Sequence, residues 1–248
     1  MPRRGASSEN VKIILTVKED MFIVLEGVDG SGKSTQIANL QRMFTEQGVE
    51  CEYLHFPRFD APYFGDMIAR FLRGELGSIE QVDPYVVALL YAEDRRDAAK
   101  MIRGWIAEGK VVICDRYVYS NVGYQCAKLS DDQEREKLRE WILSLEYDYF
   151  AIPQPDLSLF LDVPFAFTER KLKQEVREGD DRAYLHGKKD IHEQSMDLQR
   201  AVRQVYINAA QKDENMHVID CSCQGEMASA EQIFERIMGV VSNYISKR

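Results

Sequence analysis

The sequence predicts an α/β protein of three layers, α/β/α, around a central five-stranded parallel sheet. Two observations predict this fold class. Five short apolar runs are typical of buried strands, and helix-length segments separate each run from the next. Such alternation favours parallel strands joined by right-handed crossovers. The five runs are Met21–Glu26, Cys51–Phe56, Val111–Asp115, Leu157–Leu161 and His217–Asp220.

The helices that follow the first two strands are predicted from their start signals. Glycines after the first strand lead into a helical pattern that begins near Lys33. Asp83 followed by Pro84 is typical of a helix start, because aspartate caps free N–H groups and proline suits the first helical position. We expect this second helix to run to about Ala107.

Two later helices are predicted from capping and apolar spacing. The segment Ser130–Gln133 fits a capping box, which opens a helix. One face of that helix is expected in the core and consists of Leu138, Trp141, Ile142 and Leu145. The last helix has an apolar stripe formed by Ile233, Ile237, Val241 and either Tyr244 or Ile245.

Composition limits the classes of partner. The 248 residues include 32 Lys and Arg against 41 Asp and Glu, a formal charge of −9, which argues against binding to nucleic acid or to an anionic membrane. Hydrophobic residues make up 45% of the chain, as in ordinary globular proteins. No apolar run approaches the roughly 20 residues that a membrane-spanning helix needs.

The chain is expected to form one domain over residues 21–248, preceded by an extension of residues 1–20. No repeat, low-complexity tract or flexible linker marks a second domain. The apolar run near the N-terminus is too short for a secretory signal, so targeting is not expected. The five cysteines form no CxxC pair, and reduced thiols in a cytoplasmic protein are the simplest interpretation.

One segment, Glu169–Lys189, has an unusual composition. It carries seven basic residues and almost no large apolar residue after Val176, so we expect its middle to be exposed and mobile. We expect residues 175–190, approximately, to form a lid over a site. The alternative is a solvated charged loop without function. The basic residues are Arg170, Lys171, Lys173, Arg177, Arg182, Lys188 and Lys189.

A phosphate site is predicted between the first strand and the first helix. Residues 27–34 match the pattern G-x-x-x-x-G-K-[ST] in the expected strand–loop–helix context. Glycine lets backbone N–H groups wrap a polyphosphate, and the helix N-terminus adds its positive end. The expected ATP- or GTP-binding residues are Gly27, Gly30, Ser31, Gly32, Lys33, Ser34 and Thr35. Lys33 is expected to reach the β- and γ-phosphates and Ser34 to ligate Mg²⁺.

A second substrate site is predicted from three segments that place arginine beside aromatic residues, at residues 56–59, 91–95 and 115–121. Arg58 and Arg116 both follow strand ends, where ligands bind in open α/β sheets. Tyr91 and Arg95 are four residues apart and share one helix face. An aromatic ring with nearby guanidinium groups is a suitable receptor for a flat base and a phosphate monoester.

With these motifs the sequence resembles the thymidylate kinase family of nucleoside monophosphate kinases, over nearly all of the chain from Met21 onward. The resemblance implies a P-loop NTPase fold with a mobile lid. It rests on the phosphate loop with Asp29 inside it, on Phe56-Pro57-Arg58, Asp94-Arg95, Asp115-Arg116-Tyr117, Asn121, Tyr124, and on Asp190 and Glu193.

The resemblance implies roles for the residues around the acceptor nucleotide. Asp29 would meet the 3′-hydroxyl of the deoxyribose, and Arg58 would hold the acceptor phosphate. Tyr91, where the family more often has phenylalanine, would stack on thymine. Arg95 and Asn121 would read the polar edge of the base. The remaining substrate-binding residues are Phe56, Tyr124, which would close the space of a 2′-hydroxyl, Asp190 and Glu193.

The resemblance also implies the catalytic groups. Lys33 and Arg116 would contact the transferred phosphoryl group, Arg116 bridging donor and acceptor. Asp115 would serve Mg²⁺ together with Ser34. A lid arginine would add positive charge, and Arg177 and Arg182 are the two arginines available. Lys188 and Lys189 stand where the family usually has a catalytic arginine, and which of these four residues reaches the phosphates is left open.

The implied reaction moves the γ-phosphoryl group of ATP to dTMP, with Mg²⁺ as cofactor and ATP and dTMP as the only partners besides a second copy. The family usually forms homodimers, for which the helix after Asp83 is a candidate contact. A kinase for a deoxynucleoside or another pyrimidine monophosphate is the alternative on the same scaffold. A non-catalytic nucleotide-binding regulator has less support, because no N-K-x-D guanine motif is present.

The lid hypothesis makes a testable prediction. Arg182→Ala or Arg177→Ala is expected to lower turnover far more than dTMP affinity, because a lid closes over both bound substrates and excludes water. Steady-state kinetics and dTMP titrations of the two variants check this, and unchanged turnover in both would contradict the lid assignment.

Overall fold

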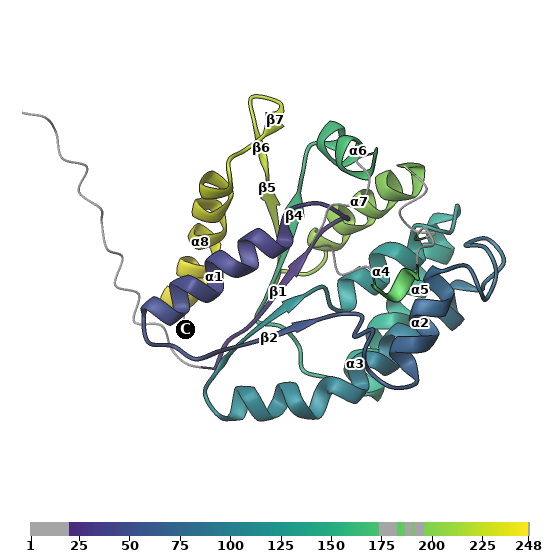
Figure 1. Cartoon of the computed structure of the whole chain (residues 1–248), viewed down its shortest axis with the longest axis horizontal. Coiled ribbons are helices and arrows are strands. Elements are labelled where there is room, and N and C mark those ends of the chain that lie inside the picture. Colours follow the sequence, from purple (N-terminus) through teal and green to yellow (C-terminus); the bar gives the residue numbers. More distant parts are fainter. Residues whose placement is uncertain (1–19, 174–182, 187–189, 191–195, 248) are drawn as a thin grey trace, which may run out of the picture.

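The centre of the molecule is a sheet of five strands that all run parallel (Figure 1). In a computed structural model, which describes residues 20–173, 183–186, 190 and 196–247, the strand order is β2-β3-β1-β4-β5. The strands are β1 (Phe22–Glu26), β2 (Cys51–His55), β3 (Val111–Asp115), β4 (Leu157–Asp162) and β5 (Met216–Asp220). The predicted five-stranded parallel sheet is therefore confirmed, with strand ends within one residue of those expected.

Helices cover both faces of this sheet, which gives the predicted three layers (Figure 1). One face is covered by α1 (Lys33–Glu46) and α8 (Ala230–Lys247). The other is covered by α3 (Pro84–Ala107), α4 (Val118–Cys126), α5 (Asp132–Leu143) and α7 (Met196–Ala210). The smaller elements are α2 (Phe64–Leu72), a π-helical turn η1 (Ser144–Tyr149), α6 (Phe165–Lys173), a 3₁₀ turn η2 (Ala183–Leu185) and a hairpin of β6 (Ser222–Cys223) and β7 (Glu226–Met227).

The start of α3 is as predicted, whereas the start of α5 is not. The Asp83 carboxylate accepts from the backbone N–H of Tyr85 at 2.8 Å. The capping box at Ser130–Gln133 is wrong: Asp131 caps α5, and its Oδ1 accepts from the backbone N–H groups of Gln133 and Glu134 at 2.9 Å. A carboxylate one residue further along can take both free N–H groups at once and displaces the serine from this role.

The predicted core faces are confirmed for α8 and only in part for α5. Ile233, Ile237 and Val241 are buried along α8. In α5 Leu138 and Ile142 are buried, but Trp141 is 36% exposed and Leu145, just beyond the helix, is half-buried. Trp141 lies at the rim of the face and packs edge-on against the Tyr85 ring at 5.1 Å.

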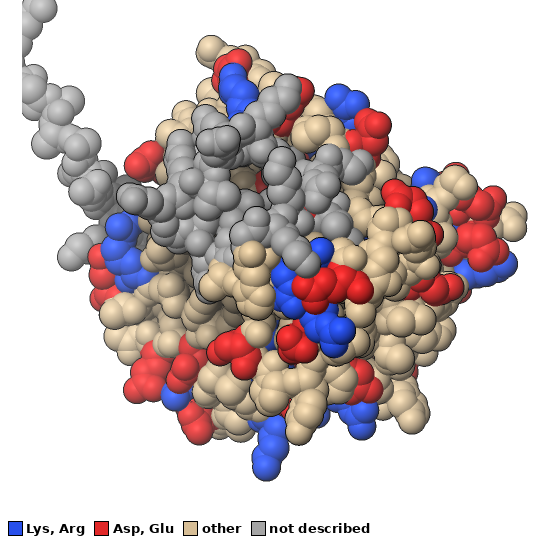
Figure 2. All heavy atoms as spheres, turned by 45° about the vertical axis from the view of Figure 1, so that its right-hand side comes forward, with Lys and Arg blue, Asp and Glu red and all other residues tan. Residues whose placement is uncertain are grey.

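All five cysteines lie in the described part and are free thiols. None of the helices in the described ranges is both long and apolar enough to cross a bilayer. Acidic and basic side chains are interspersed on the face shown in Figure 2.

Several sequence-based expectations lie outside the described residues. These are the extension apart from Asp20, the lid apart from residues 183–186 and 190, and the candidate residues Arg177, Arg182 and Glu193.

Candidate active site

The predicted phosphate loop connects β1 to α1 at the carboxyl edge of the sheet. Gly30 and Gly32 have φ of +71° and +88°, a left-handed conformation that favours glycine. A Cβ on Gly27 would lie 2.6 Å from the Ser31 hydroxyl oxygen, so no larger residue fits there without movement. The loop is therefore held in a shape that leaves backbone N–H groups beside the N-terminus of α1.

The hydroxyl groups of this loop differ in exposure. Ser31 is buried, and no described group forms a hydrogen bond with its Oγ. Ser34 and Thr35, in the first turn of α1, are exposed. A ligand at this helix end can therefore reach both of them, as the sequence predicts.

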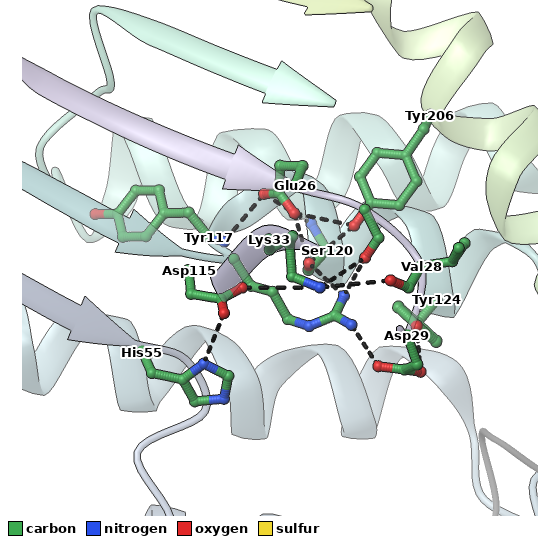
Figure 3. A network of polar contacts seen from close by, with 12 residues as sticks. Glu26, Val28, Asp29, Lys33, His55, Asp115, Tyr117, Ser120, Tyr124 and Tyr206 are labelled. Atoms are coloured by element: carbon green, nitrogen blue, oxygen red, sulfur yellow. Dashed lines mark hydrogen bonds and ion pairs between the residues drawn. The ribbon is translucent and has the colours of Figure 1, made fainter. Parts of the chain in front are cut away.

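Lys33 points back over the loop rather than into solvent (Figure 3). Its Nζ lies 3.4 Å from the carbonyl oxygens of Gly27 and Val28 and 3.8 Å from Asp115 Oδ1. Burial, together with the positive charge of Arg116, lowers the pKa of Lys33, while Asp115 opposes this. The ammonium group thus lies beside the loop, where a bound anion would take the place of its two long contacts with the carbonyl oxygens.

Asp115 ends β3 and faces the side chains of Lys33, His55 and Arg116. Burial alone would raise the pKa of its carboxyl, but Lys33, His55 and Arg116 lower it to about 2. The Nδ1 of His55 lies 3.5 Å from Asp115 Oδ2. Asp115 Oδ1 is buried, and no described group donates a hydrogen bond to it.

These features fit a Mg²⁺ ion that shares its ligands with a nucleotide. The ionised carboxylate of Asp115 ends β3 and the exposed Ser34 hydroxyl lies in the first turn of α1, and both are oxygen ligands of the kind Mg²⁺ prefers. Within the described ranges no group of three or more acidic, His or Cys side chains could enclose a metal alone. The donor set suits a metal held mainly by phosphates and water.

The low pKa of Asp115 makes stability depend on pH. Because the folded pKa lies below the ordinary 3.8, the carboxylate stabilises the fold above pH ~4, and this contribution of about 2 kcal/mol is lost as the pH falls towards ~2. We expect the difference in unfolding free energy between wild type and Asp115→Asn to shrink by this amount over that range. Urea titrations with a chelator present measure it; a constant difference would contradict the prediction.

Arg116 lies at the junction between the phosphate loop and the cavity behind it. Its Nη2 is 2.5 Å from Asp29 Oδ1, and its Nη1 donates to the Gly27 carbonyl at 2.8 Å and to Ser120 Oγ at 3.2 Å. Its φ is +67°, a strained conformation for a non-glycine residue that persists only when the surroundings impose it. The guanidinium is therefore fixed before any ligand binds.

Glu26, which the sequence analysis did not single out, holds the segment that directly follows Arg116 (Figure 3). It is fully buried at the end of β1, and burial raises its pKa. Its Oε1 accepts from the backbone N–H groups of Tyr117 and Ser120, and its Oε2 accepts from the hydroxyls of Ser120 at 2.6 Å and Tyr206 at 2.9 Å. An acidic residue that ends an otherwise apolar strand was the available signal.

A cavity of about 290 Å³ opens beside Arg116 and brings most of the predicted acceptor-site residues together. The predicted residues that line it are Asp29, Gly30, Phe56, Tyr91, Arg95, Arg116, Asn121, Tyr124 and Asp190. The sequence did not identify several other lining residues, among them His55, Leu72, Gln125 and Tyr184. These are mostly aromatic or apolar, and composition alone does not separate such residues from core.

One part of the cavity wall is formed by Asp29 and Tyr124. The Tyr124 hydroxyl donates to Asp29 Oδ2 at 2.8 Å, and the Arg116 guanidinium lies 5.4 Å from the centre of the Tyr124 ring. Burial raises the pKa of Tyr124 well above its ordinary value, so the phenol remains a donor. A carboxylate, a phenol and a guanidinium thus meet at one point of the cavity wall.

Another part of the cavity wall contains a buried ion pair. Arg95 and Glu146 are both nearly inaccessible to solvent, and Glu146 accepts from Arg95 Nε at 2.5 Å and from Nη2 at 2.7 Å. Burial alone would lower the pKa of Arg95, but Glu146 raises it above its ordinary value. Tyr91, four residues before Arg95 on α3, also lines the cavity, as predicted.

Asp190 is buried at the cavity wall, where its Oδ2 accepts from the Tyr184 hydroxyl at 3.0 Å. The Tyr184 ring in turn stacks on Phe59, with ring centres 3.7 Å apart and planes 8° from parallel. The η2 turn is thereby attached to the segment that follows β2.

Arg58 is the one predicted acceptor-site residue in the described ranges that is not among those lining the cavity. Its Nη2 lies 2.8 Å from Asp94 Oδ1 and 2.7 Å from Asp97 Oδ2, and its backbone N–H donates to Asp94 at 2.9 Å. The predicted contact with an acceptor phosphate therefore stays a prediction.

Comparison with known proteins gives consistent matches. The family model for thymidylate kinase matches residues 25–233. A probable thymidylate kinase of Pyrococcus abyssi is 34% identical over 224 residues, 90% of this chain and 96% of that protein. A thymidylate kinase of Mycobacterium tuberculosis is 32% identical over 190 residues, 77% of this chain and 86% of that protein. The solved thymidylate kinase structure of Candida albicans, 23% identical, covers 92% of this chain and 93% of its own with a TM-score of 0.67, which shows a shared fold. The chain belongs to the thymidylate kinase family.

Proposed function

We propose that the protein transfers the γ-phosphoryl group of ATP to the 5′-phosphate of dTMP, giving dTDP and ADP. The observation that carries this proposal is the position of Arg116, whose guanidinium contacts both the phosphate loop at Gly27 and the cavity residue Asp29. Two nucleotides whose phosphates meet at Arg116 lie in the arrangement that direct phosphoryl transfer needs.

The donor site is the phosphate loop. Its backbone N–H groups and the start of α1 take the β- and γ-phosphates, with Lys33 at their side and Thr35 near the α-phosphate. When bound, Mg²⁺ neutralises phosphate charge, with Ser34 and Asp115 as its protein ligands, the latter directly or through water.

The acceptor site is the cavity. Tyr91 stacks on the thymine ring, Asp29 meets the 3′-hydroxyl, and Tyr124 occupies the space that a 2′-hydroxyl would need. Arg95 and Asn121 face the polar edge of the base. Phe56, Arg58, Asp190 and, beyond the described residues, Glu193 complete the proposed set.

The chemistry is mainly electrostatic positioning. A phosphate monoester has its second pKa near 6, so the acceptor is mostly a dianion at neutral pH and needs no general base. Lys33 and Arg116 stabilise charge on the transferred group, and a lid arginine, Arg177 or Arg182, is proposed to complete the cationic shell.

We also propose a cytoplasmic homodimer that associates through α3. The five free thiols suit a reducing compartment. Three apolar side chains of α3 are exposed, with Val86 at 54%, Leu89 at 40% and Met101 at 38%. Light scattering of the full chain tests the dimer, and a monomeric mass would exclude it.

The test of the proposed reaction is a panel assay. The protein is incubated with Mg·ATP and, separately, dTMP, dUMP, UMP, CMP and thymidine, and ADP release is measured. We expect dTMP to be the best acceptor, with some use of dUMP, because one methyl group is worth only about 1–3 kcal/mol of selectivity. Turnover with thymidine but not with dTMP would favour a nucleoside kinase, and no turnover with any acceptor would favour a regulator.

A further inference from the structure

Glu146 is a buried carboxylate with two partners at the base end of the cavity. It lies in the π-helical turn η1, a type of distortion often found at functional sites. Besides its two bonds with Arg95, its Oε1 accepts from Asn121 Nδ2 at 3.1 Å. One carboxylate therefore positions both residues that we place at the polar edge of the base.

The contacts of Asn121 define which way its amide group faces. Its Nδ2 donates to Glu146 Oε1 and, at 3.0 Å, to the carbonyl oxygen of Ala88. Both partners are acceptors only, so both must face the NH₂ group and a flipped amide would place oxygen against oxygen. Asn121 Oδ1 is buried, and no described group donates a hydrogen bond to it.

Arg95 and Asn121 together thus present a fixed pattern to a base. The guanidinium of Arg95 contains donors only, and the atom of Asn121 without a protein partner is an acceptor. Thymine has the complementary pair, the O4 acceptor beside the N3–H donor. Cytosine has the reverse pair, an amino donor beside the N3 acceptor.

We propose that Glu146 is a positioning residue for base selection: by holding the Arg95 guanidinium and the Asn121 amide in one orientation, it makes the site accept thymine and reject cytosine. This inference rests on the proposed function. Bound dCMP would place donor against donor and acceptor against acceptor in a buried site. A site built around such hydrogen bonds rejects the mismatched analogue by on the order of 10⁴ in kcat/KM.

The test is the ratio of kcat/KM for dTMP to that for dCMP in Glu146→Gln. Glutamine keeps the side-chain shape but has only one oxygen, so its NH₂ group must face Arg95 or Asn121. The Ala88 carbonyl still restrains Asn121, so we expect the ratio to fall by about 10- to 100-fold rather than to vanish. A general loss of fold or activity would lower both rates and leave the ratio unchanged.

Asp162→Asn is the matched control. Asp162 accepts from Arg203 Nε at 2.5 Å and Nη2 at 2.7 Å, the same two-bond arrangement, but its partner Arg203 does not line the cavity, whereas Arg95, the partner of Glu146, does. We expect its dTMP-to-dCMP ratio to equal that of wild type. An equal fall of the ratio in Asp162→Asn and Glu146→Gln would overturn the inference.

A double-mutant cycle separates action through Asn121 from other effects. In the Asn121→Ala background, Glu146→Gln is expected to lower the ratio less than it does in the wild-type background, because only its effect through Arg95 remains. A fall as large as in the wild-type background would overturn the proposed action through Asn121.

One measurement does not depend on Glu146→Gln, in case that variant fails to fold. The side-chain amide protons of Asn121, assigned by their loss in Asn121→Ala, are expected to exchange with water at least about tenfold more slowly than those of exposed asparagines. Rapid exchange, or a wild-type enzyme that uses dCMP as well as dTMP, would overturn the inference and leave the kinase proposal standing. A wild type inactive on every nucleotide would instead refute the proposed function.

Discussion

Arg116→Met is expected to lower kcat by on the order of a thousandfold or more, with a smaller change in dTMP affinity. The guanidinium is fixed by the Gly27 carbonyl, Asp29 and Ser120 before substrates bind. Charge that develops on the transferred phosphoryl group is therefore met by a donor that needs no reorganisation. Methionine keeps much of the side-chain length and removes the charge and every N–H group.

Turnover and dTMP binding of Arg116→Met and of the wild type must be measured separately. Steady-state kinetics give kcat, and calorimetry gives the dissociation constant of dTMP. Arg42→Met serves as control, because Arg42 is an exposed arginine of α1 whose Nη2 contacts only the Asn39 side chain in the described structure. A kcat for Arg116→Met within about tenfold of wild type would contradict a role at the transferred group.

Lys33→Met is expected to lower kcat by about 10² to 10³ and to weaken ATP binding, while dTMP binding changes little. The Nζ group is 3.4 Å from two loop carbonyl oxygens and 3.8 Å from Asp115, so it lies above the loop that holds the β- and γ-phosphates in our proposal. Its loss also leaves the buried carboxylate of Asp115 with one cation fewer, so we expect a lower melting temperature.

Titrations with an ATP analogue and with dTMP separate the two binding sites in this variant. Lys137→Met, an exposed lysine of α5 with 63% side-chain exposure, is the control for loss of one positive charge. If dTMP affinity fell as much as ATP affinity, the division into a lysine-bearing donor site and a separate acceptor cavity would be incorrect.

The parts of the fold and site that could be predicted depend on residues that are close together in the sequence. The three inner strands β1, β3 and β4 are short, mostly apolar runs because a parallel sheet is covered on both faces, and such runs are visible without tertiary information, whereas the edge strands β2 and β5 are less buried. The phosphate loop is likewise a contiguous motif. Tyr91 and Arg95 reach one cavity because helical spacing places them on one face of α3.

The parts that could not be predicted depend on contacts between distant segments. Glu146 is 51 residues from Arg95 and Glu26 is 180 residues from Tyr206, and nothing in their sequence neighbourhoods indicates these partners. Arg58 follows the end of β2, as predicted, but its guanidinium forms ion pairs with the carboxylates of Asp94 and Asp97. Trp141 has the spacing of a core residue, but α5 lies at the edge of the helical layer and leaves it at the rim.

Ligand binding tests most directly whether two nucleotides are held with their phosphates facing each other. The full chain, saturated with Mg²⁺ and a non-hydrolysable ATP analogue, is titrated with dTMP in a calorimeter. We predict one dTMP bound per chain while the analogue stays in place. Uptake of neither dTMP nor any related mononucleotide, or displacement of the analogue by dTMP, would contradict the account.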